Sequence, residues 1–147
     1  MYSFSVYSSP ITFPFCFAVH TWIVLESPEF GIKRYEIHKF INKKTGNYFY
    51  INIQAPTEGM PIFMIPRKFY SKKKFKSKIL FSLNGEEIRR VVENIEREIP
   101  NYPYLNKYHL YPGPNSNTFT RWVLNLNEVT KNIKLPLNAF GGSSSFF

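Results

Sequence analysis

The chain has very little cysteine. Cys16 is the single cysteine among 147 residues, so no disulfide can form within the chain and no oxidising compartment is implied. The same count excludes a zinc site built from several cysteines. The sequence also lacks a glycine-rich phosphate loop, a paired-histidine metal motif and a G-x-S-x-G nucleophile elbow. We therefore expect neither a metal nor a cofactor.

Long hydrophobic runs are absent as well. The most apolar stretch, ITFPFCFAVHTWIVL at residues 11–25, is too short to cross a bilayer and is interrupted by Pro14 and His20. No Lys or Arg precedes Lys33, so the positive region that opens a secretory signal peptide is missing. These features predict a soluble chain without a signal peptide or a transmembrane helix.

Acidic residues are scarce, with 10 against 19 basic ones, and the net charge is +9. The excess is local, because RKFYSKKKFKSK at residues 67–78 holds seven basic residues and no acidic one. This pattern favours a solvated loop or a lysine-protected edge strand. The alternative is a surface for anionic lipid, with nucleic acid as the least favoured partner, since aromatic residues interleave the charges. We call this the basic patch: Arg67, Lys68, Lys72, Lys73, Lys74, Lys76 and Lys78.

The composition is that of one globular domain rich in strands. Hydrophobic residues make up 44% of the chain, and 15 Phe with 10 Tyr favour strands over helices. Residues 13–25 are apolar on both alternating faces, which is typical of a central strand covered on both sides. Further strands are predicted at four places, the first two joined by a hairpin turn at NKKTGN: residues 32–41, 48–53, 61–65 and 78–83.

Two helices are predicted in the second half of the chain. Residues 85–99 carry one apolar stripe, with Asn84 as N-cap and Pro100 after the last turn. A second helix begins near Asn117, and its buried face comprises Phe119, Trp122, Val123 and Leu126. The fold class is therefore α+β, a mostly antiparallel sheet packed against two main helices. We expect a single domain over residues 1–141 and a low-complexity tail at 142–147.

A candidate catalytic site includes the start of the second helix. Unpaired N–H groups and the positive end of the helix dipole at Ser116 can stabilise an oxyanion, and a serine nucleophile needs a base. His20 on the central strand is the candidate base, and Glu36 or His38 on the next strand can orient it. Beside Ser116, three residues are candidates for the oxyanion hole or cleft: Asn115, Asn117 and Thr118.

A structural role for the same residues is the alternative. Ser and Asn are the commonest helix N-caps, so the NSNT motif alone is more typical of a cap than of a catalytic site. A histidine among apolar residues is usually a hydrogen-bonded core group, and we assign His109 such a role. Whether the chain is an enzyme stays open at this level.

Several stretches resemble one known family. FAVHTWIVLE, KRYEIHKF, YPGPNSNTFTRWV and LPLNAFG occur in an order and spacing similar to the bacterial family called domain of unknown function 3750. The resemblance covers about residues 5–141, and PGPNSNTF is its most distinctive part. Members of that family look like envelope-associated proteins with an N-terminal membrane segment, so the resemblance implies association with the cell envelope.

A more distant resemblance concerns mechanism. A strand H-T-x-I-V before a helix-opening N-x-N-x-F is similar to circularly permuted papain-like hydrolases, such as PPPDE-type isopeptidases and permuted NlpC-type enzymes. Those proteins carry a cysteine within an Asn-Cys-Asn pattern at the helix start. The resemblance places His20 at the histidine position and Ser116 at the cysteine position, and serine is the less reactive nucleophile.

Together these patterns predict a permuted papain-like domain that hydrolyses amide, peptide or ester bonds with Ser116 and His20. The rival prediction is a non-catalytic module that binds a cell-envelope or anionic ligand. Its partner would be a small molecule, a peptide or an envelope component, and the sequence does not name it. A hydrogen bond between Ser116 Oγ and a ring nitrogen of His20, opening on a pocket, would favour the first prediction.

Overall fold

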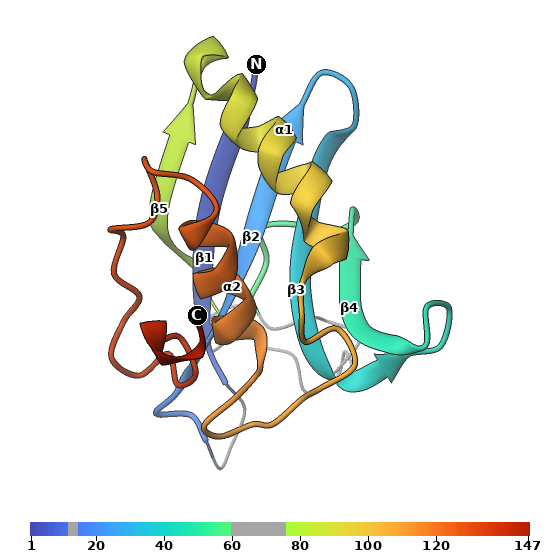
Figure 1. Cartoon of the computed structure of the whole chain (residues 1–147), viewed down its shortest axis with the longest axis vertical. Helices are drawn as coiled ribbons and strands as arrows, with labels where there is room; N and C mark the ends of the chain where they lie inside the picture. Colours follow the sequence, from blue (N-terminus) through green and yellow to red (C-terminus); the bar gives the residue numbers. More distant parts are fainter. Residues whose placement is uncertain (12–14, 60–75) are drawn as a thin grey trace.

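One antiparallel sheet carries the fold. The computed structural model describes residues 1–11, 15–59 and 76–147. Within these residues, five strands have the spatial order β4-β3-β2-β1-β5, and helices α1 (Arg89–Glu98) and α2 (Ser116–Asn125) lie across one face (Figure 1). The predicted α+β class, with an antiparallel sheet against two main helices, is confirmed. The strands are β1 (Ser3–Pro10), β2 (Val19–Ser27), β3 (Gly31–Asn42), β4 (Asn47–Asn52) and β5 (Lys78–Asn84).

The central strand begins later than the sequence predicts. β2 starts at Val19, after a turn in which the Ala18 N–H donates to the Phe15 carbonyl at 2.9 Å. Residues 12–14 lie outside the described residues. The strand is nonetheless central and covered on both sides, because Ile23 on one face and Trp22 on the other are both fully buried. The predicted double-sided burial therefore holds for the part of the strand that forms.

β1 has no counterpart among the predicted strands, although it pairs with both β2 and β5. Phe4 and Val6 are fully buried on its helix-facing side. Serines occupy most of the remaining positions, and clustered serines usually indicate a strand boundary rather than a strand. The other described strands, β3, β4 and β5, lie where the sequence predicts them, and the candidate strand at residues 61–65 lies outside the described residues.

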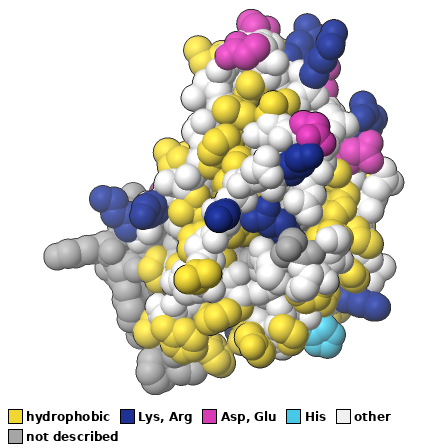
Figure 2. Space-filling model, turned by 60° about the vertical axis from the view of Figure 1, so that its left-hand side comes forward, with side chains coloured by type: hydrophobic (Ala, Val, Ile, Leu, Met, Phe, Trp, Pro, Cys, Tyr) yellow, Lys and Arg dark blue, Asp and Glu magenta, His cyan; other side chains and the backbone are white. Residues whose placement is uncertain are grey.

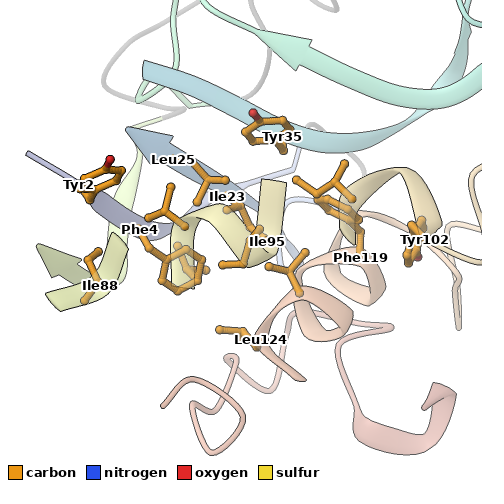
Figure 3. Close-up of a cluster of buried hydrophobic side chains, with 14 of the residues drawn as sticks. Tyr2, Phe4, Ile23, Leu25, Tyr35, Ile88, Ile95, Tyr102, Phe119 and Leu124 are labelled. Carbon is orange, nitrogen blue, oxygen red and sulfur yellow. The ribbon is translucent and has the colours of Figure 1, made fainter. Parts of the chain in front are cut away.

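The hydrophobic core lies between the helices and the facing side of the sheet (Figure 3). Alternation along each strand decides which side chains reach it, so Ile23 and Leu25 of β2 face the helices while Trp22 faces away. The helices contribute Ile95 and Phe119, among others. The opposite side of the sheet is therefore free to hold polar side chains, and it does so at the site described below.

The first helical segment differs from the prediction at both ends. Asn84 is the last residue of β5 and does not cap a helix, because Gly85 follows it at φ 129° and a 3₁₀ turn over Glu86–Ile88 leads into α1. Pro100 lies within a second 3₁₀ turn, Ile99–Asn101, so the α-helix ends at Glu98. Among the described residues, no helix combines the length and the apolarity needed to span a membrane.

Phe119 anchors α2 to the core more firmly than Trp122. Phe119 is fully buried against Phe49 and Tyr102, with ring centroids 5.8 and 5.1 Å away. Trp122, which the sequence predicts as a buried anchor, is only partly buried and contacts Tyr102 at 5.3 Å. The helix is thus rotated so that Phe119, rather than the larger indole, is enclosed.

We expect Phe119→Ala to lower the free energy of unfolding by ~3–5 kcal/mol, the usual cost of removing a large buried aromatic side chain. Trp122→Ala is the matched control on the same helix, and its partial burial predicts a smaller loss of ~1–2 kcal/mol. Urea denaturation of both variants measures the difference. Equal losses, or a larger loss at Trp122, would contradict this assignment of the buried face.

Candidate functional site

The start of α2 forms hydrogen bonds with the part of β2 that does not pair with β3. The register between β2 and β3 runs from Ser27↔Gly31 to Ile23↔Tyr35 and goes no further along these two described strands. Beyond that point, the Asn117 side chain pairs with the β2 backbone: its Oδ1 accepts from the Thr21 N–H at 2.9 Å, and its Nδ2 donates to the Val19 carbonyl at 3.0 Å. One side-chain amide therefore satisfies backbone groups that a neighbouring strand would otherwise satisfy.

Asn115 is the N-cap of α2, so the helix begins at Ser116, one residue before the predicted start near Asn117. Its Oδ1 accepts from the N–H groups of Asn117 and Thr118, and the Thr118 hydroxyl in turn accepts from the Asn115 N–H. The Asn115 Nδ2 donates to the carbonyls of Leu110 and Phe140, both at 3.0 Å. This capping box ties the helix to the loop before it and to the C-terminal segment.

The three residues predicted for an oxyanion hole are engaged in these structural contacts. The Asn115 amide donates its two hydrogens to the carbonyls of Leu110 and Phe140. The Asn117 amide donates its two hydrogens to the carbonyls of Val19 and Phe140. The Thr118 hydroxyl donates to the Gly141 carbonyl at 2.8 Å. These side chains hold the helix start in place, and none of them has a hydrogen left to donate to an oxyanion in this structure.

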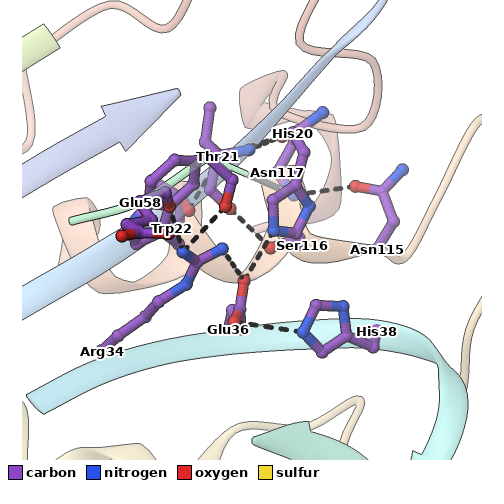
Figure 4. A network of polar contacts seen from close by, with 12 residues as sticks. His20, Thr21, Trp22, Arg34, Glu36, His38, Glu58, Asn115, Ser116 and Asn117 are labelled. Carbon is purple, nitrogen blue, oxygen red and sulfur yellow. Dashed lines mark hydrogen bonds and ion pairs between the residues drawn. The ribbon is translucent and has the colours of Figure 1, made fainter. Parts of the chain in front are cut away.

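On the other side of the sheet, a buried carboxylate gathers three basic side chains (Figure 4). Glu36 Oε2 lies 2.6 Å from an Arg34 terminal nitrogen and 2.8 Å from His20 Nε2, and its Oε1 lies 3.1 Å from His38 Nε2. Alternation along β3 places Arg34, Glu36 and His38 on one face. The predicted base and both predicted orienting residues therefore lie together.

Arg34 is the member of this cluster that the sequence reasoning missed. Its guanidinium donates to the carbonyls of Glu58 and Gly59 at 2.6 and 3.1 Å, and it lies over the Trp22 ring at 3.9 Å from the ring centre. The sequence contains a pattern that predicts its membership: Arg34 is two residues before Glu36 on a predicted strand, so the two side chains share one face. Buried arginine is rare without a partner, and Glu36 is that partner.

Burial and the Glu36 carboxylate act in opposite directions on the protonation of His20. Burial lowers the pKa of His20 to about 4, although the hydrogen bond and charge of Glu36 oppose the shift. Burial alone would raise the pKa of Glu36, but the charges of His38 and Arg34 and the hydrogen bonds from both imidazoles hold it well below its usual value. A carboxylate only accepts, so the neutral His20 carries its hydrogen on Nε2 and a lone pair on Nδ1.

His20 and Ser116 line the same cavity, which has a volume of about 360 Å³. Asn115 and Asn117 lie beside them on its wall, and the remaining lining is apolar or aromatic. The structure thus brings the predicted base and nucleophile to one pocket. No hydrogen bond joins them among the described residues, since the Ser116 hydroxyl donates to the Thr21 carbonyl at 2.5 Å.

His20, Glu36 and His38 could each offer one atom to a metal ion, and these atoms lie within 4.8 Å of one another. Two histidines and a carboxylate are a common zinc ligand set. However, the Arg34 guanidinium is 2.6 Å from the same carboxylate, and its positive charge disfavours a cation there. A cation in this cluster would therefore have to share the carboxylate with the Arg34 guanidinium.

The basic patch contributes little to what can be described. Lys76 and Lys78 are exposed at the start of the β5 segment. The other predicted members lie outside the described residues: Arg67, Lys68, Lys72, Lys73 and Lys74. His109, predicted to be a structural core group, is exposed, so its side chain is not part of the core.

We expect Asn117→Ala to lower the free energy of unfolding by about 3 kcal/mol or more, because it leaves buried backbone groups of β2 without partners, at ~1–3 kcal/mol each. Asn125→Ala, at the exposed end of the same helix, is the control and should stay within ~0.5 kcal/mol of the parent. Chemical denaturation measures both. A small loss at Asn117 would mean that α2 docks on β2 without this amide.

The stability of the fold should fall as the pH drops from 6.5 toward 4. In that window the unfolded chain protonates His20, whose ordinary pKa is 6.5, while the folded chain holds it neutral. The difference corresponds to a loss of about 3 kcal/mol. Glu36 acts in the same direction at lower pH, because its depressed pKa stabilises the fold only while the carboxylate is ionised.

Urea unfolding measured at intervals between pH 4.5 and 8 tests this expectation. His20→Gln should flatten the dependence between pH 6.5 and 5, whereas His109→Gln, at an exposed histidine, should leave it as in the parent. A parent-like slope in His20→Gln would show that another group causes the acid sensitivity.

The comparisons with known proteins place the chain in a family. A scan against protein-family models matches residues 2–143 to a family described as "Protein of unknown function (DUF3750)". This range includes His20, Glu36 and Ser116, and thus the whole of the site. No curated protein and no solved structure matches the chain. As the resemblance around PGPNSNTF predicted, the chain belongs to the DUF3750 family.

Proposed function

We propose that this protein is a hydrolase of amide, peptide or ester bonds that uses Ser116 as nucleophile and His20 as general base. One observation carries the proposal. The imidazole of His20 is fixed by a buried, ionised Glu36 at 2.8 Å, and it shares a 360 Å³ cavity with a serine at the first residue of a helix. Carboxylate, imidazole and hydroxyl in this order are the parts of a serine-hydrolase triad.

The reaction begins with a rotation of the Ser116 hydroxyl. In this structure the hydroxyl donates to the Thr21 carbonyl. In the proposed reaction its hydrogen has to turn to the lone pair of His20 Nδ1 as the serine oxygen attacks the substrate carbonyl carbon. His20 then gives the proton to the leaving amine or alcohol as the carbon–nitrogen or carbon–oxygen bond breaks. A water molecule, deprotonated by the same imidazole, releases the acid from the serine and restores the hydroxyl.

The oxyanion needs donors that the capping side chains do not supply. Asn115 accepts from the N–H groups of Asn117 and Thr118, so the Ser116 N–H is the first-turn donor that the cap leaves available. It lies at the positive end of the α2 dipole, which favours negative charge on the substrate oxygen. In this proposal the oxyanion therefore accepts a hydrogen bond from the Ser116 backbone N–H and not from the asparagine amides.

The order of these residues along the chain also supports the distant resemblance to permuted papain-like hydrolases. A histidine on a central strand comes first, and a small nucleophile between two asparagines opens a helix later: Asn115, Ser116 and Asn117. In this proposal the asparagines hold the nucleophile rather than contact the substrate. Serine replaces the thiol of those enzymes, so the fixed, neutral base carries more of the activation.

A thiol titration tests the pair without a known substrate. In a Cys16→Ala background, Ser116→Cys should react with iodoacetamide with a thiol pKa well below the ordinary ~8.5, and His20→Ala should return the pKa toward that value. Ser143→Cys, at an exposed position outside the cavity, is the control and should titrate ordinarily. An ordinary thiol at 116 that is indifferent to His20 would overturn the proposal.

A non-catalytic binding module is the second candidate, and one observation favours it. The Ser116 hydroxyl and both asparagine amides satisfy backbone groups in the described structure, so the cavity presents mainly apolar surface. Such a module would hold a small envelope component or another apolar molecule. It predicts an ordinary thiol in the titration above, together with ligand binding that survives Ser116→Ala.

A further inference from the structure

We infer that the bond cleaved is the ester or amide of an uncharged, hydrophobic acyl group, and that this group occupies the cavity beside Ser116. The inference rests on the proposed function and names its substrate class. Apart from His20 and the helix start, the described lining consists of aliphatic and aromatic side chains, and the hydroxyls of Tyr108 and Tyr111 are its other polar groups. A substrate carbonyl placed at Ser116 therefore directs its acyl part onto apolar surface.

Among the described residues that line the cavity, none carries a charged side chain at neutral pH. His20 is held neutral above a pH of about 4, and the asparagine amides of the wall are bonded to backbone carbonyls. A carboxylate or ammonium on the acyl group would lose its hydration without gaining an oppositely charged partner among these residues. The volume of about 360 Å³ is at the small end of the ~300–1,000 Å³ typical of small-molecule sites. It suits a medium-sized acyl group.

Hydrogen bonds join Phe140, an aromatic residue of the cavity wall, to the start of α2. Phe140 packs against Phe17 and Tyr111, with ring centroids 6.2 and 5.8 Å away, and its carbonyl accepts from both Asn115 Nδ2 and Asn117 Nδ2. The amides that position Ser116 thus also position the apolar wall. This arrangement fixes the distance between the nucleophile and the surface that would receive the acyl group.

The cavity opens among exposed aromatic side chains. Phe17 and Tyr111 line it and are 62% and 73% exposed. Figure 1 places the loop before β2 and the loop before α2 at the same end of the molecule, and Figure 2 shows hydrophobic side chains gathered at that lower end. Large exposed apolar side chains around a pocket are typical of a binding site for an apolar ligand.

A series of p-nitrophenyl esters tests the inference on the full chain. We expect kcat/KM to rise at least tenfold from acetate through butyrate to octanoate, since each buried methylene group can contribute about fourfold. The p-nitrophenyl monoester of succinic acid, which carries a charge on the acyl part, should react more slowly than butyrate. Ser116→Ala should abolish the enzymatic rate with every ester.

One variant at the cavity mouth and one matched control separate binding in the cavity from general hydrophobic adsorption. Phe17→Asp places a charge at the cavity mouth on an exposed side chain, and it should lower kcat/KM for octanoate at least tenfold and for acetate much less. Phe40→Asp, at a 53% exposed phenylalanine that does not line this cavity, is the matched control and should leave the series unchanged.

The outcomes distinguish the two proposals. Ser116-dependent hydrolysis with a flat or falling chain-length profile would overturn the acyl-group inference and leave the hydrolase proposal intact. The absence of any Ser116-dependent hydrolysis, combined with an ordinary thiol in the Ser116→Cys titration, would overturn both. Equal effects of Phe17→Asp and Phe40→Asp on octanoate would also contradict the assignment of the acyl group to this cavity.

Discussion

The amide of Asn117 takes the place of a strand beside β2, and the whole candidate site depends on it. β3 stops pairing with β2 at Ile23↔Tyr35, so the backbone of Thr21 and Val19 needs other partners in a buried setting. A side-chain amide offers one acceptor and two donors, which matches the requirement of a strand edge. Satisfying these groups holds the first turn of α2 against the start of β2.

This contact between α2 and β2 explains how Ser116, on the helix side of the sheet, and His20, on the other side, line one cavity. Thr21 faces α2 and bonds to Asn117 and Thr120, whereas His20, its neighbour, belongs to the other face and bonds to Glu36. Where β3 no longer pairs with β2, the helix start reaches the edge of β2. Ser116 and His20 then line the same 360 Å³ space.

The second constraint is the charge of Glu36. A buried carboxylate is costly unless it is paired and hydrogen-bonded, and Arg34 and two imidazoles meet that need. The hydrogen bond to Glu36 fixes the His20 ring and assigns the ring hydrogen to Nε2, whereas burial keeps the ring neutral at physiological pH against the pull of the Glu36 charge. A neutral ring with its lone pair on Nδ1 can accept a proton, and a serine nucleophile depends on such a base more than a cysteine does.

Much of this arrangement follows from local sequence patterns. Alternation predicts that Glu36 and His38 share a face, and the same rule would have added Arg34. The apolar stripe predicts the buried face of α1. The resemblance carried by PGPNSNTF predicts the family that the comparison with family models finds. These features depend on residues a few positions apart, so the sequence carries them directly. β1 is not predicted because its many serines are atypical of a buried strand. Its burial results from pairing with β2 and β5, which the local sequence does not record.

By itself the sequence determined the strand faces, the helix stripe and the residue types available for chemistry, because backbone geometry fixes periodicity locally. Only the tertiary structure decided that Asn115 and Asn117 hold the fold, that Ser116 donates to Thr21, and that His20 is neutral. Ser116 and Thr21 are 95 residues apart, and their contact exists because β2 and β3 separate where α2 begins. Hydrogen-bond satisfaction and desolvation of charge depend on everything packed around a group, which no local pattern records.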